Sequence, residues 1–487
     1  TEWSKWRSGS LLFGLLMIPL TYALGLRLFR SRFCGFVAGY LLAIDFLHMV
    51  QSRVTMLDIY LAFFILLGSW AAWRFIESDR DMGGWATLSV LSFAIGFACK
   101  WNSLFAGLGA FIAMLMLKRY PPQRATFFDE LGRLVGWVVL LTPLAWRVLH
   151  LDAGAAVIAA ACVAGVLNVL GGLRRLPTLR GPGLWFTRIS MLYLVLLPAM
   201  YLISFVPFMW QHNWNVHSSY TDAVKNHKVM FNFRYSNEFT HRYMSNFWSW
   251  PTMMRPVWYH YEEHKDPEGS PIPPDTDRWW SRLAWRGQSP VRYITGILAM
   301  GSPFVWWTYL VFLVLTLAQS VFLPLGAIAQ SALRAVRKAS SHRTVEESWS
   351  EEAALAAVAA DTGGASPALD PFRTFRAGLA AAKEVYDGWR FGPERPWLFL
   401  LLIYAPQVLL WSVNRGFLFY MLPCVPLMSI FVAAILREWL DLPWGRLCAF
   451  AYLAIATVFF LAYYPLLAGV SIPRPIYEVL VFTPKWI

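Results

Sequence analysis

The chain has 487 residues, of which 57% are hydrophobic and 15% are charged, and its formal net charge is +13. A positive charge of this size can indicate nucleic-acid binding, but here Lys and Arg cluster in short loops between apolar segments, as in the cytoplasmic loops of membrane proteins. We therefore expect no nucleic-acid partner. The five cysteines lie in or beside apolar segments without metal-ligand spacing, so we predict neither a disulfide framework nor a zinc site.

Most apolar residues are gathered into segments that could cross a bilayer, which takes roughly 20 largely apolar residues and at least about 17. We predict about twelve spans, at residues 11–28, 34–50, 54–75, 84–99, 102–118, 134–151, 154–171, 188–209, 297–327, 396–413, 416–437 and 445–468. The first segment is not a signal peptide, because it lacks a small-residue cleavage site and leads directly into another span. The sequence therefore predicts an all-α polytopic membrane protein.

Basic residues occur in every second loop, which predicts the orientation of the spans, since cytoplasmic loops hold the excess of Lys and Arg. The basic loops carry Arg27, Arg30 and Arg32, then Arg74 and Arg80, Lys118, Arg119 and Arg124, Arg174, Arg175 and Arg180, Arg334, Arg337 and Lys338, and finally Arg437 and Arg446. The other loops, 51–53, 99–102, 210–296, 414–415 and the tail from 469, are then expected outside. This orientation puts Thr1 outside too, so we expect a further helix upstream of it.

Two segments interrupt the membrane pattern and divide the chain. Residues 1–209 form the N-terminal part of the transmembrane core, and 210–296 form an outer loop rich in Trp, Tyr, His and Asn. Long loops of this kind usually carry function. Residues 297–328 return to the membrane, and 329–395 form a cytoplasmic insert whose composition predicts partial disorder and no chemistry. Residues 396–487 complete the transmembrane part and end in an outer tail.

Ionisable residues near the spans converge on the outer side, where each is a functional candidate because charge at membrane depth is costly. Asp45, His48, Arg53 and Asp58 lie at the turn between the second and third spans, Lys100 and Trp101 at the next outer turn, Asn414 and Arg415 at a third, and Arg255 in the long outer loop. They predict a cationic pocket for a phosphate whose lipid tail stays in the bilayer. The alternative is that the cations extend to lipid headgroups and the Trp and Tyr residues form an ordinary interfacial belt.

Two carboxylates of this set need a separate interpretation, because a carboxylate repels phosphate. Asp58 could pair with Arg53 or Lys100 and fix their geometry, or it could simply match the dipole of the helix that it begins. Asp45 and His48 are three residues apart, which favours a buried supporting hydrogen bond.

The outer loop contains the segment WSWPTMMRPVWYHYE, in which Trp248, Trp250, Trp258 and Tyr259 are candidates for shaping a cleft. Such side chains stack on sugars or lie along a membrane surface. The histidines of this loop match no ligand pattern, so we predict no metal site. Glu262 and Glu263 could serve as a base, although solvated loop carboxylates are more common.

With these motifs in view, the chain resembles the protein O-mannosyltransferase family, GT-C membrane glycosyltransferases that use a polyprenyl-phosphate-linked mannose. The matching segments, in the order of the family, are AIDFLHMVQSRVTMLDIYLAFF, GFACKWNSLF, WSWPTMMRPVWYHYE, AMGSPFVWW and NRGFLFYMLPCVPLM. The resemblance implies a GT-C helical bundle and inverting transfer of mannose to Ser or Thr hydroxyls of exported proteins. It also implies that no cofactor is needed beyond the lipid-linked donor.

The resemblance also implies roles for individual residues. Arg53 is the first candidate for binding the donor phosphate, followed by Lys100, Arg255 and Arg415. Asp45, Asp58, Trp101 and Asn414 would support them, and the aromatic residues of the outer loop would shape the acceptor or lipid cleft.

The chain departs from the family pattern in two places. The Asp-Glu pair and the His-Pro-Pro stretch of the family's first outer loop do not occur, so the resemblance places the catalytic base upstream of TEWSKWRSGSLLFG and assigns no catalytic residue to this chain. We expect the chain alone to be inactive without those residues. The outer loop is also too short for the extra β-trefoil domain of eukaryotic members, which favours a bacterial plasma-membrane enzyme with its active face outward.

The expected partners are the bilayer, polyprenyl-phosphate-mannose and exported acceptor proteins, with the secretion translocon as a further candidate. Two alternatives remain open. One is another GT-C transferase that moves a pentose or an aminosugar to a glycan or to lipid A. The other is a transporter of polyprenyl-linked sugars, which would place ionisable residues nearer the middle of the bilayer.

Overall fold

The computed structural model of the chain describes residues 2–78, 83–118, 182–211, 213–215, 221–222, 224–229, 232, 241–265, 292–317, 392, 395–412 and 416–481. The expected spans at 134–151 and 154–171, Asn414, Arg415 and most of the expected insert lie outside these residues. The chain divides into two compact units, residues 1–309 with 399–487, and residues 310–398. The described part of the second unit is the end of one helix, the start of another and residue 392.

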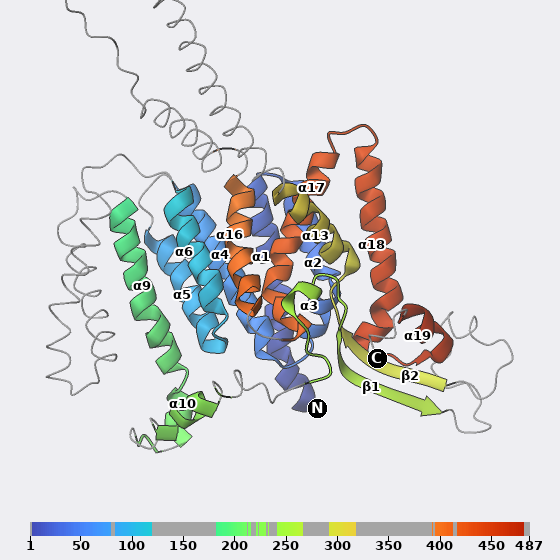
Figure 1. Cartoon of the computed structure of the whole chain (residues 1–487), viewed down its shortest axis with the longest axis horizontal. Coiled ribbons are helices and arrows are strands. Elements are labelled where there is room, and N and C mark those ends of the chain that lie inside the picture. Colours follow the sequence, from blue (N-terminus) through green and yellow to red (C-terminus); the bar gives the residue numbers. More distant parts are fainter. Residues whose placement is uncertain are drawn as a thin grey trace, which may run out of the picture. The chain divides into compact units, whose positions relative to one another are not determined.

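The N-terminal half consists of helices in every part that the structure describes. They are α1 (Glu2–Phe29), α2 (Arg32–Ala43), α3 (Phe46–Gln51), α4 (Leu57–Glu77), α5 (Gly83–Cys99), α6 (Ser103–Leu117), α9 (Pro182–Ile203) and α10 (Val206–Gln211). In Figure 1 the longer ones stand side by side as a layer of upright helices.

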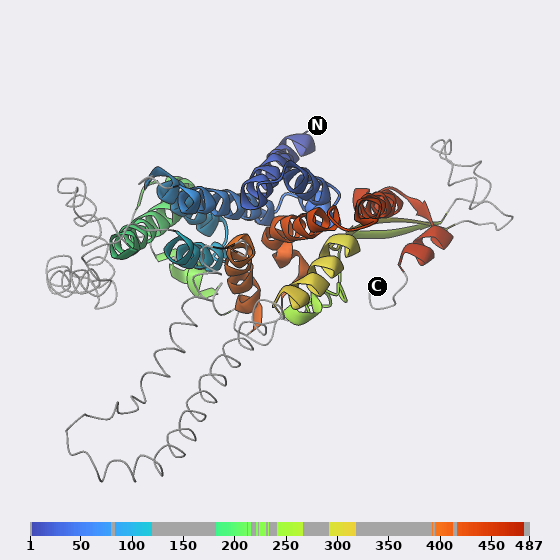
Figure 2. The same ribbon diagram turned by 90° about the horizontal axis from the view of Figure 1, so that it is seen from above.

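The C-terminal half adds further helices and a small sheet. Its helices are α13 (Pro303–Leu317), α16 (Arg395–Leu409), α17 (Val425–Trp439), α18 (Gly445–Ala468) and α19 (Arg474–Leu480), with short 3-10 turns η1 (Phe247–Ser249), η3 (Leu410–Ser412) and η4 (Leu418–Cys424). Helix α17 is buried between its neighbours along almost its whole length, whereas most residues of α18 are not buried inside the protein. Figure 2 shows the helices of the layer from above.

The membrane character expected from the sequence is confirmed. Five helical segments among the described residues are long and apolar enough to cross a bilayer: Arg7–Phe29, Leu57–Glu77, Arg188–Gln211, Leu418–Trp439 and Gly445–Ala468. Their apolar side chains are compatible with the hydrocarbon core of the bilayer, and their backbone polar groups are hydrogen-bonded within each helix. The chain is therefore a mostly helical, integral membrane protein.

Among the expected spans that differ from the observed elements, two do so for identifiable reasons. The span at 34–50 is divided at Asp45, whose carboxylate accepts a hydrogen bond from the backbone N–H of His48 and begins the separate helix α3. The span expected from residue 297 begins later, because residues up to Ala299 form a strand. Helix α13 starts at Pro303, a residue favoured in the first helical turn.

The three-stranded antiparallel sheet was not expected from the sequence. Its order is β1 (Val257–Lys265), β2 (Arg292–Ala299) and β3 (Ile472–Pro473). Val257 pairs with Ala299 and Lys265 with Arg292, and an irregularity between Trp258 and His260 shifts the register. The sheet joins the outer loop to the C-terminal tail.

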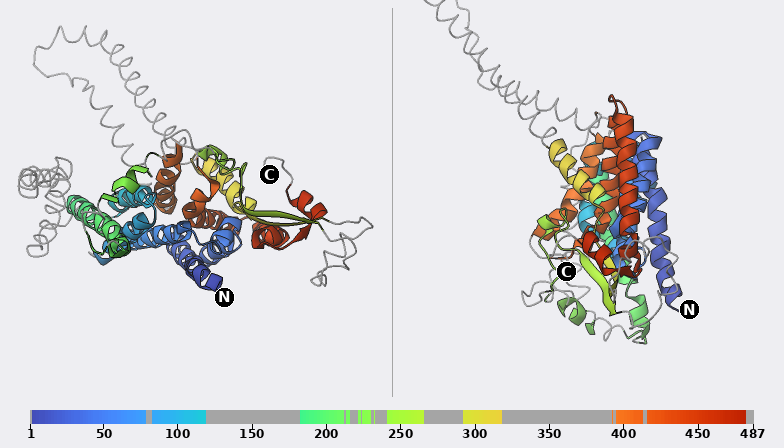
Figure 3. Two further views of the ribbon diagram at one scale, coloured as in Figure 1. Left: turned by 90° about the horizontal axis from the view of Figure 1, so that it is seen from below. Right: turned by 90° about the vertical axis from the view of Figure 1, so that its right-hand side faces the viewer.

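The two ends of the helical layer differ in character. At one end Arg27 lies 3.8 Å from Glu77, and the Lys118 ammonium donates to the carbonyl oxygen of Phe75 at 2.8 Å. At the opposite end lie α3, the sheet and α10, together with the start of α1, as Figures 1 and 3 show. The segments predicted to share one side thus converge at one end, and this is where the candidate residues lie.

Candidate functional site

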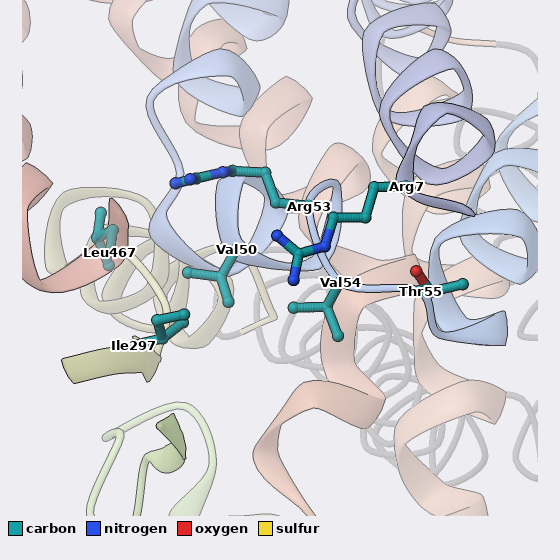
Figure 4. Close-up of a pocket in the computed structure, with 7 residues that line it drawn as sticks. All are labelled: Arg7, Val50, Arg53, Val54, Thr55, Ile297 and Leu467. Atoms are coloured by element: carbon teal, nitrogen blue, oxygen red, sulfur yellow. The ribbon is translucent and has the colours of Figure 1, made fainter. Parts of the chain in front are cut away.

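A pocket lies beside the turn that follows α3. Its cavity volume is about 400 Å³, within the range of small-molecule sites. Figure 4 shows the residues that line it, which are Arg7, Val50, Arg53, Val54, Thr55, Ile297 and Leu467. They come from α1, α3 and its turn, β2 and the end of α18. The lining therefore combines two cations with a mainly apolar wall.

Arg53, the first candidate from the sequence, lies in this pocket. Its side chain is exposed, and its Nη2 donates to the carbonyl oxygen of Ala468 at 3.4 Å, at the C-terminal end of α18. That helix end carries partial negative charge, which favours a nearby guanidinium. No carboxylate among the described residues forms an ion pair with Arg53. Most of its hydrogen-bonding capacity is thus available to an anion.

Arg7 is the second cation of the pocket, and the sequence analysis did not single it out. It lies in the first turns of α1, it is exposed, and the described residues offer it no ion pair. In Figure 4 its guanidinium reaches toward Val54, whereas that of Arg53 reaches toward Leu467. A cation just before an apolar span is common, so the position of Arg7 in the sequence did not mark it as a pocket residue. The available signal was the rarity of cations on the outer side.

Lys100 does not line this pocket. Its Nζ lies 2.8 Å from Oδ1 of Asp58, in the first turn of α4, and 3.9 Å from the ring centroid of Tyr420. The Asp58 side chain is 5% exposed and that of Lys100 is 26% exposed. The ammonium is therefore matched by a carboxylate and an aromatic face. Of the two partners considered for Asp58, the structure shows Lys100.

Tyr259 connects the outer loop to this region. Its hydroxyl accepts from Nε2 of Gln51 at 2.7 Å and donates to the sulfur of Met56 at 3.2 Å. Burial, with a smaller contribution from the Asp58 carboxylate, raises the pKa of Tyr259 above its ordinary value. The hydroxyl therefore stays neutral and serves as a fixed link between β1 and α3.

Asp45 and His48 are buried. Asp45 is 0% exposed, and its Oδ2 accepts from the backbone N–H of Ser302 at 3.0 Å and from Nε1 of Trp306 at 3.2 Å. His48 Nε2 lies 3.1 Å from the carbonyl oxygen of Gly14. These bonds join α3 to the start of α13 and to α1. Asp45 is the N-cap of α3 and bonds to the backbone N–H of His48, whereas the supporting role of this pair stays a prediction.

The aromatic residues of the outer loop are not equivalent. Trp248 is 63% exposed, whereas Trp250 is 1% exposed and Trp258 is 8% exposed. Trp250 packs against Trp411, with ring centroids 5.8 Å apart, and Trp258 packs against Tyr477 at 6.0 Å. The two buried tryptophans therefore hold the loop in place and do not present a surface to a ligand, as a cleft would require.

The loop of residues 241–255 is anchored to the segment that follows Arg415. The backbone N–H of Ser245 donates to the carbonyl oxygen of Gly416 at 2.9 Å, and the reverse bond is 3.0 Å long. Arg255 is exposed and donates to the carbonyl oxygen of Met244 at 3.4 Å, and it does not line the pocket.

Trp101 lies beside Lys100 and is 38% exposed. Its Nε1 donates to the hydroxyl of Tyr201 at 3.3 Å, and its ring stacks on His227 at 6.0 Å.

Within the described residues, no group of three or more His, Cys, Asp or Glu side chains could hold a metal ion. The structure thus brings Arg53 and Arg7 together in the pocket, whereas Lys100 pairs with Asp58, and Trp101 packs against His227.

Comparisons with known proteins match two parts of the chain. The family model described as dolichyl-phosphate-mannose-protein mannosyltransferase matches residues 2–122, and the model of the C-terminal four-transmembrane region of protein O-mannosyltransferase matches residues 219–350. A polyprenol-phosphate-mannose–protein mannosyltransferase of Corynebacterium glutamicum is 29% identical over 175 residues, which cover 29% of this chain and 34% of that relative. The match thus spans about one third of the relative's length. No solved structure matches the chain.

Proposed function

Because this chain belongs to the protein O-mannosyltransferase family, we propose that it transfers mannose from polyprenyl-phosphate-mannose to Ser or Thr hydroxyls of exported proteins, with inversion at the anomeric carbon. The observation that carries the proposal is the pocket that Arg53 and Arg7 line together with apolar side chains. A ligand with a phosphate next to a hydrocarbon chain has the same combination of properties.

The two arginines would stabilise the leaving group. In the transfer, the hydroxyl oxygen of the acceptor loses its proton to a general base and forms a bond to the anomeric carbon, while the bond from that carbon to the phosphate oxygen breaks. The electron pair of that bond goes to the phosphate, which gains negative charge in the transition state. Cations fixed beside it therefore stabilise the transition state more than the bound donor. The planar fork of Arg suits phosphate oxygens, and Val50 and Ile297 would contact the first isoprene units.

The neighbouring groups would hold this arrangement and receive the acceptor. Lys100 remains a candidate for contact with the donor, although its pairing with Asp58 supports a positioning role. The exposed Trp248 would contact the acceptor polypeptide or the lipid. The acceptors would be exported proteins, and the active side would face outward from a bacterial plasma membrane.

The test measures transfer of labelled mannose from polyprenyl-phosphate-mannose to a Ser/Thr-rich peptide by the full-length gene product in membranes. We expect Arg53→Ala to lower kcat/KM by about 100-fold, the usual effect of losing one donor to a developing oxyanion. Arg7→Ala should lower it by at least about tenfold. Arg27→Ala, a change at the far end of the same helix α1, is the matched control and should have little effect.

Two outcomes would point elsewhere. Transfer of a pentose or an aminosugar, with none of mannose, would indicate a different GT-C transferase. Movement of the lipid-linked sugar across vesicles without any transfer would indicate a transporter. An Arg53→Ala protein with unchanged kcat/KM would exclude the phosphate assignment for this pocket.

A further inference from the structure

Helices α1 and α3 meet at one closely packed point. A Cβ atom placed on Gly14 of α1 would lie 2.2 Å from Oγ and 2.6 Å from Cβ of Ser52, the residue that ends α3. Both distances are shorter than real Cβ contacts, so only glycine fits at this position while Ser52 is opposite. The absence of a side chain here allows the two backbones their close approach.

His48 fastens the same point with a hydrogen bond. Its Nε2 lies 3.1 Å from the carbonyl oxygen of Gly14, and since a carbonyl oxygen can only accept, Nε2 carries the proton. Oγ of Ser52 donates to the carbonyl oxygen of His48 at 2.7 Å. Gly14, His48 and Ser52 therefore form one buried contact, which we name the α1–α3 crossing.

Each cation of the pocket lies close to the crossing along its own segment of the chain. Gly14 follows Arg7 by two helical turns, so the two residues occupy nearly the same face of α1, about 10 Å apart along its axis. Ser52 directly precedes Arg53. Any change in the separation of α1 and α3 at this point is thus transmitted to the separation of the two guanidinium groups.

The other side of α3 is held independently. Asp45 bonds it to Ser302 and Trp306, and Gln51 bonds it to Tyr259. Because α3 is fixed to α13 and β1, a wider crossing would displace α1, and Arg7 with it, relative to Arg53.

We propose that the α1–α3 crossing positions the donor, with Gly14, His48 and Ser52 as positioning residues that set the spacing of Arg7 and Arg53 around the lipid phosphate. This inference rests on the proposed function for the identity of the ligand. Displacement of a binding group by about 1 Å can cost about 100-fold in rate, so even a small widening would be measurable.

The experiment widens the crossing and then restores it. Gly14→Ala forces the helices apart, while Gly14→Ala combined with Ser52→Gly leaves the new Cβ 3.5 Å from Cα of residue 52, an ordinary contact. His48→Phe removes the hydrogen bond, whereas His48→Gln keeps a donor. The matched control is Gly68→Ala, whose Cβ would lie 2.8 Å from the ring of Phe93 at a crossing outside the pocket.

We measure the KM for polyprenyl-phosphate-mannose, kcat, and binding of labelled polyprenyl phosphate without sugar, all on the full protein in detergent. Gly14→Ala and His48→Phe should raise KM and the dissociation constant by about tenfold. The double variant and His48→Gln should recover most of the wild-type values. Gly68→Ala should lower only the amount of active protein, and hence the apparent kcat, with KM unchanged.

The two proposals fail in different ways. A full-length wild-type protein that transfers no mannose refutes the proposed function. Binding of polyprenyl phosphate that still depends on Gly14 would nevertheless leave the crossing in its role. A wild-type protein that transfers mannose while Gly14→Ala shows the wild-type KM, or while the double variant recovers nothing, refutes the positioning role.

Discussion

The candidate cations of this protein differ in the partners that surround them. The Lys100 ammonium lies against the Asp58 carboxylate at 2.8 Å, so much of its charge is already matched. Arg53 has one weak bond to a helix end, to the Ala468 carbonyl oxygen at 3.4 Å. Because charge-assisted bonds are the strong ones, a phosphate gains more from Arg53 than from a lysine that already has its counter-ion.

Tyr259 gives a prediction at the residue scale, because its pKa is raised by burial above the ordinary value of 10.0. The neutral hydroxyl is favoured in the folded state, so the stability that it contributes is complete below about pH 10 and is lost as the pH rises through the folded-state pKa. At pH 8, Tyr259→Phe should lower stability by about 1 kcal/mol through its lost hydrogen bonds. Above about pH 10 this difference from wild type should shrink.

Thermal unfolding of both proteins in detergent at a series of pH values checks this prediction. Comparing the two proteins cancels the effect of every other titrating group. A stability difference that stays constant from neutral to strongly alkaline pH would contradict the assignment of a raised pKa to Tyr259.

Short and broken elements carry the site, and long helices provide the frame. Helix α3 has 6 residues, yet hydrogen bonds from its ends and side chains reach α1, α13 and β1. A helix this short has little stability of its own, so its position depends on these contacts. The small sheet is another short element that contributes to the site, since Ile297 of β2 lines the pocket.

The packing of α6 on α16 gives a prediction at the element scale. A Cβ atom on Gly109 would lie 2.0 Å from the carbonyl oxygen of Leu402, and backbone cannot rotate away as a side chain can. Gly109→Ala should therefore destabilise the protein by about 1–3 kcal/mol, the usual cost of overpacking. It should also reduce the yield of folded protein.

Gly84→Ala is the matched control, because a Cβ at Gly84 meets nothing within 4 Å. Since alanine is the better residue inside a helix, this change should be neutral or stabilising by up to about 1 kcal/mol. Thermal unfolding in detergent measures both. Equal midpoints for the two variants would show that α6 and α16 are not packed as described.

At the scale of the whole molecule, residues of the basic loops predicted to be cytoplasmic lie at one end of the helical layer. Arg27, Lys118 and Arg437 lie at one end, and the sheet, α3 and the pocket lie at the other. Under the positive-inside rule the first end faces the cytoplasm. The pocket would then open toward the compartment that exported proteins enter.

Cysteine labelling tests this orientation in intact cells. In a protein whose native cysteines are replaced by serine, a cysteine at Trp248 should react with a membrane-impermeant maleimide, because this residue is 63% exposed and its loop is predicted to lie outside. A cysteine at Arg446, near the start of α18, should react only after the membrane is permeabilised. The reverse result would invert the topology and exclude an outward-facing pocket.

The sequence by itself determined the membrane class, the family and the side on which the candidate residues gather. These three features follow from local properties of the sequence: runs of apolar residues, the alternation of basic loops, and motifs of adjacent residues. The span at 445–468 agrees with helix α18 for this reason. Arg53 could be singled out because it interrupts an apolar pattern within a few residues.

The partners of these residues were decided only by the tertiary structure. Arg7 and Arg53 lie 46 positions apart and share no pattern, so only the crossing of α1 and α3 shows that they line one pocket. Trp250 and Trp258 appeared equal to Trp248 in the sequence, yet burial separates them. Contacts between distant segments depend on how helices pack in three dimensions. Local composition predicts that an apolar side chain is buried, but it does not predict which residue that side chain will contact.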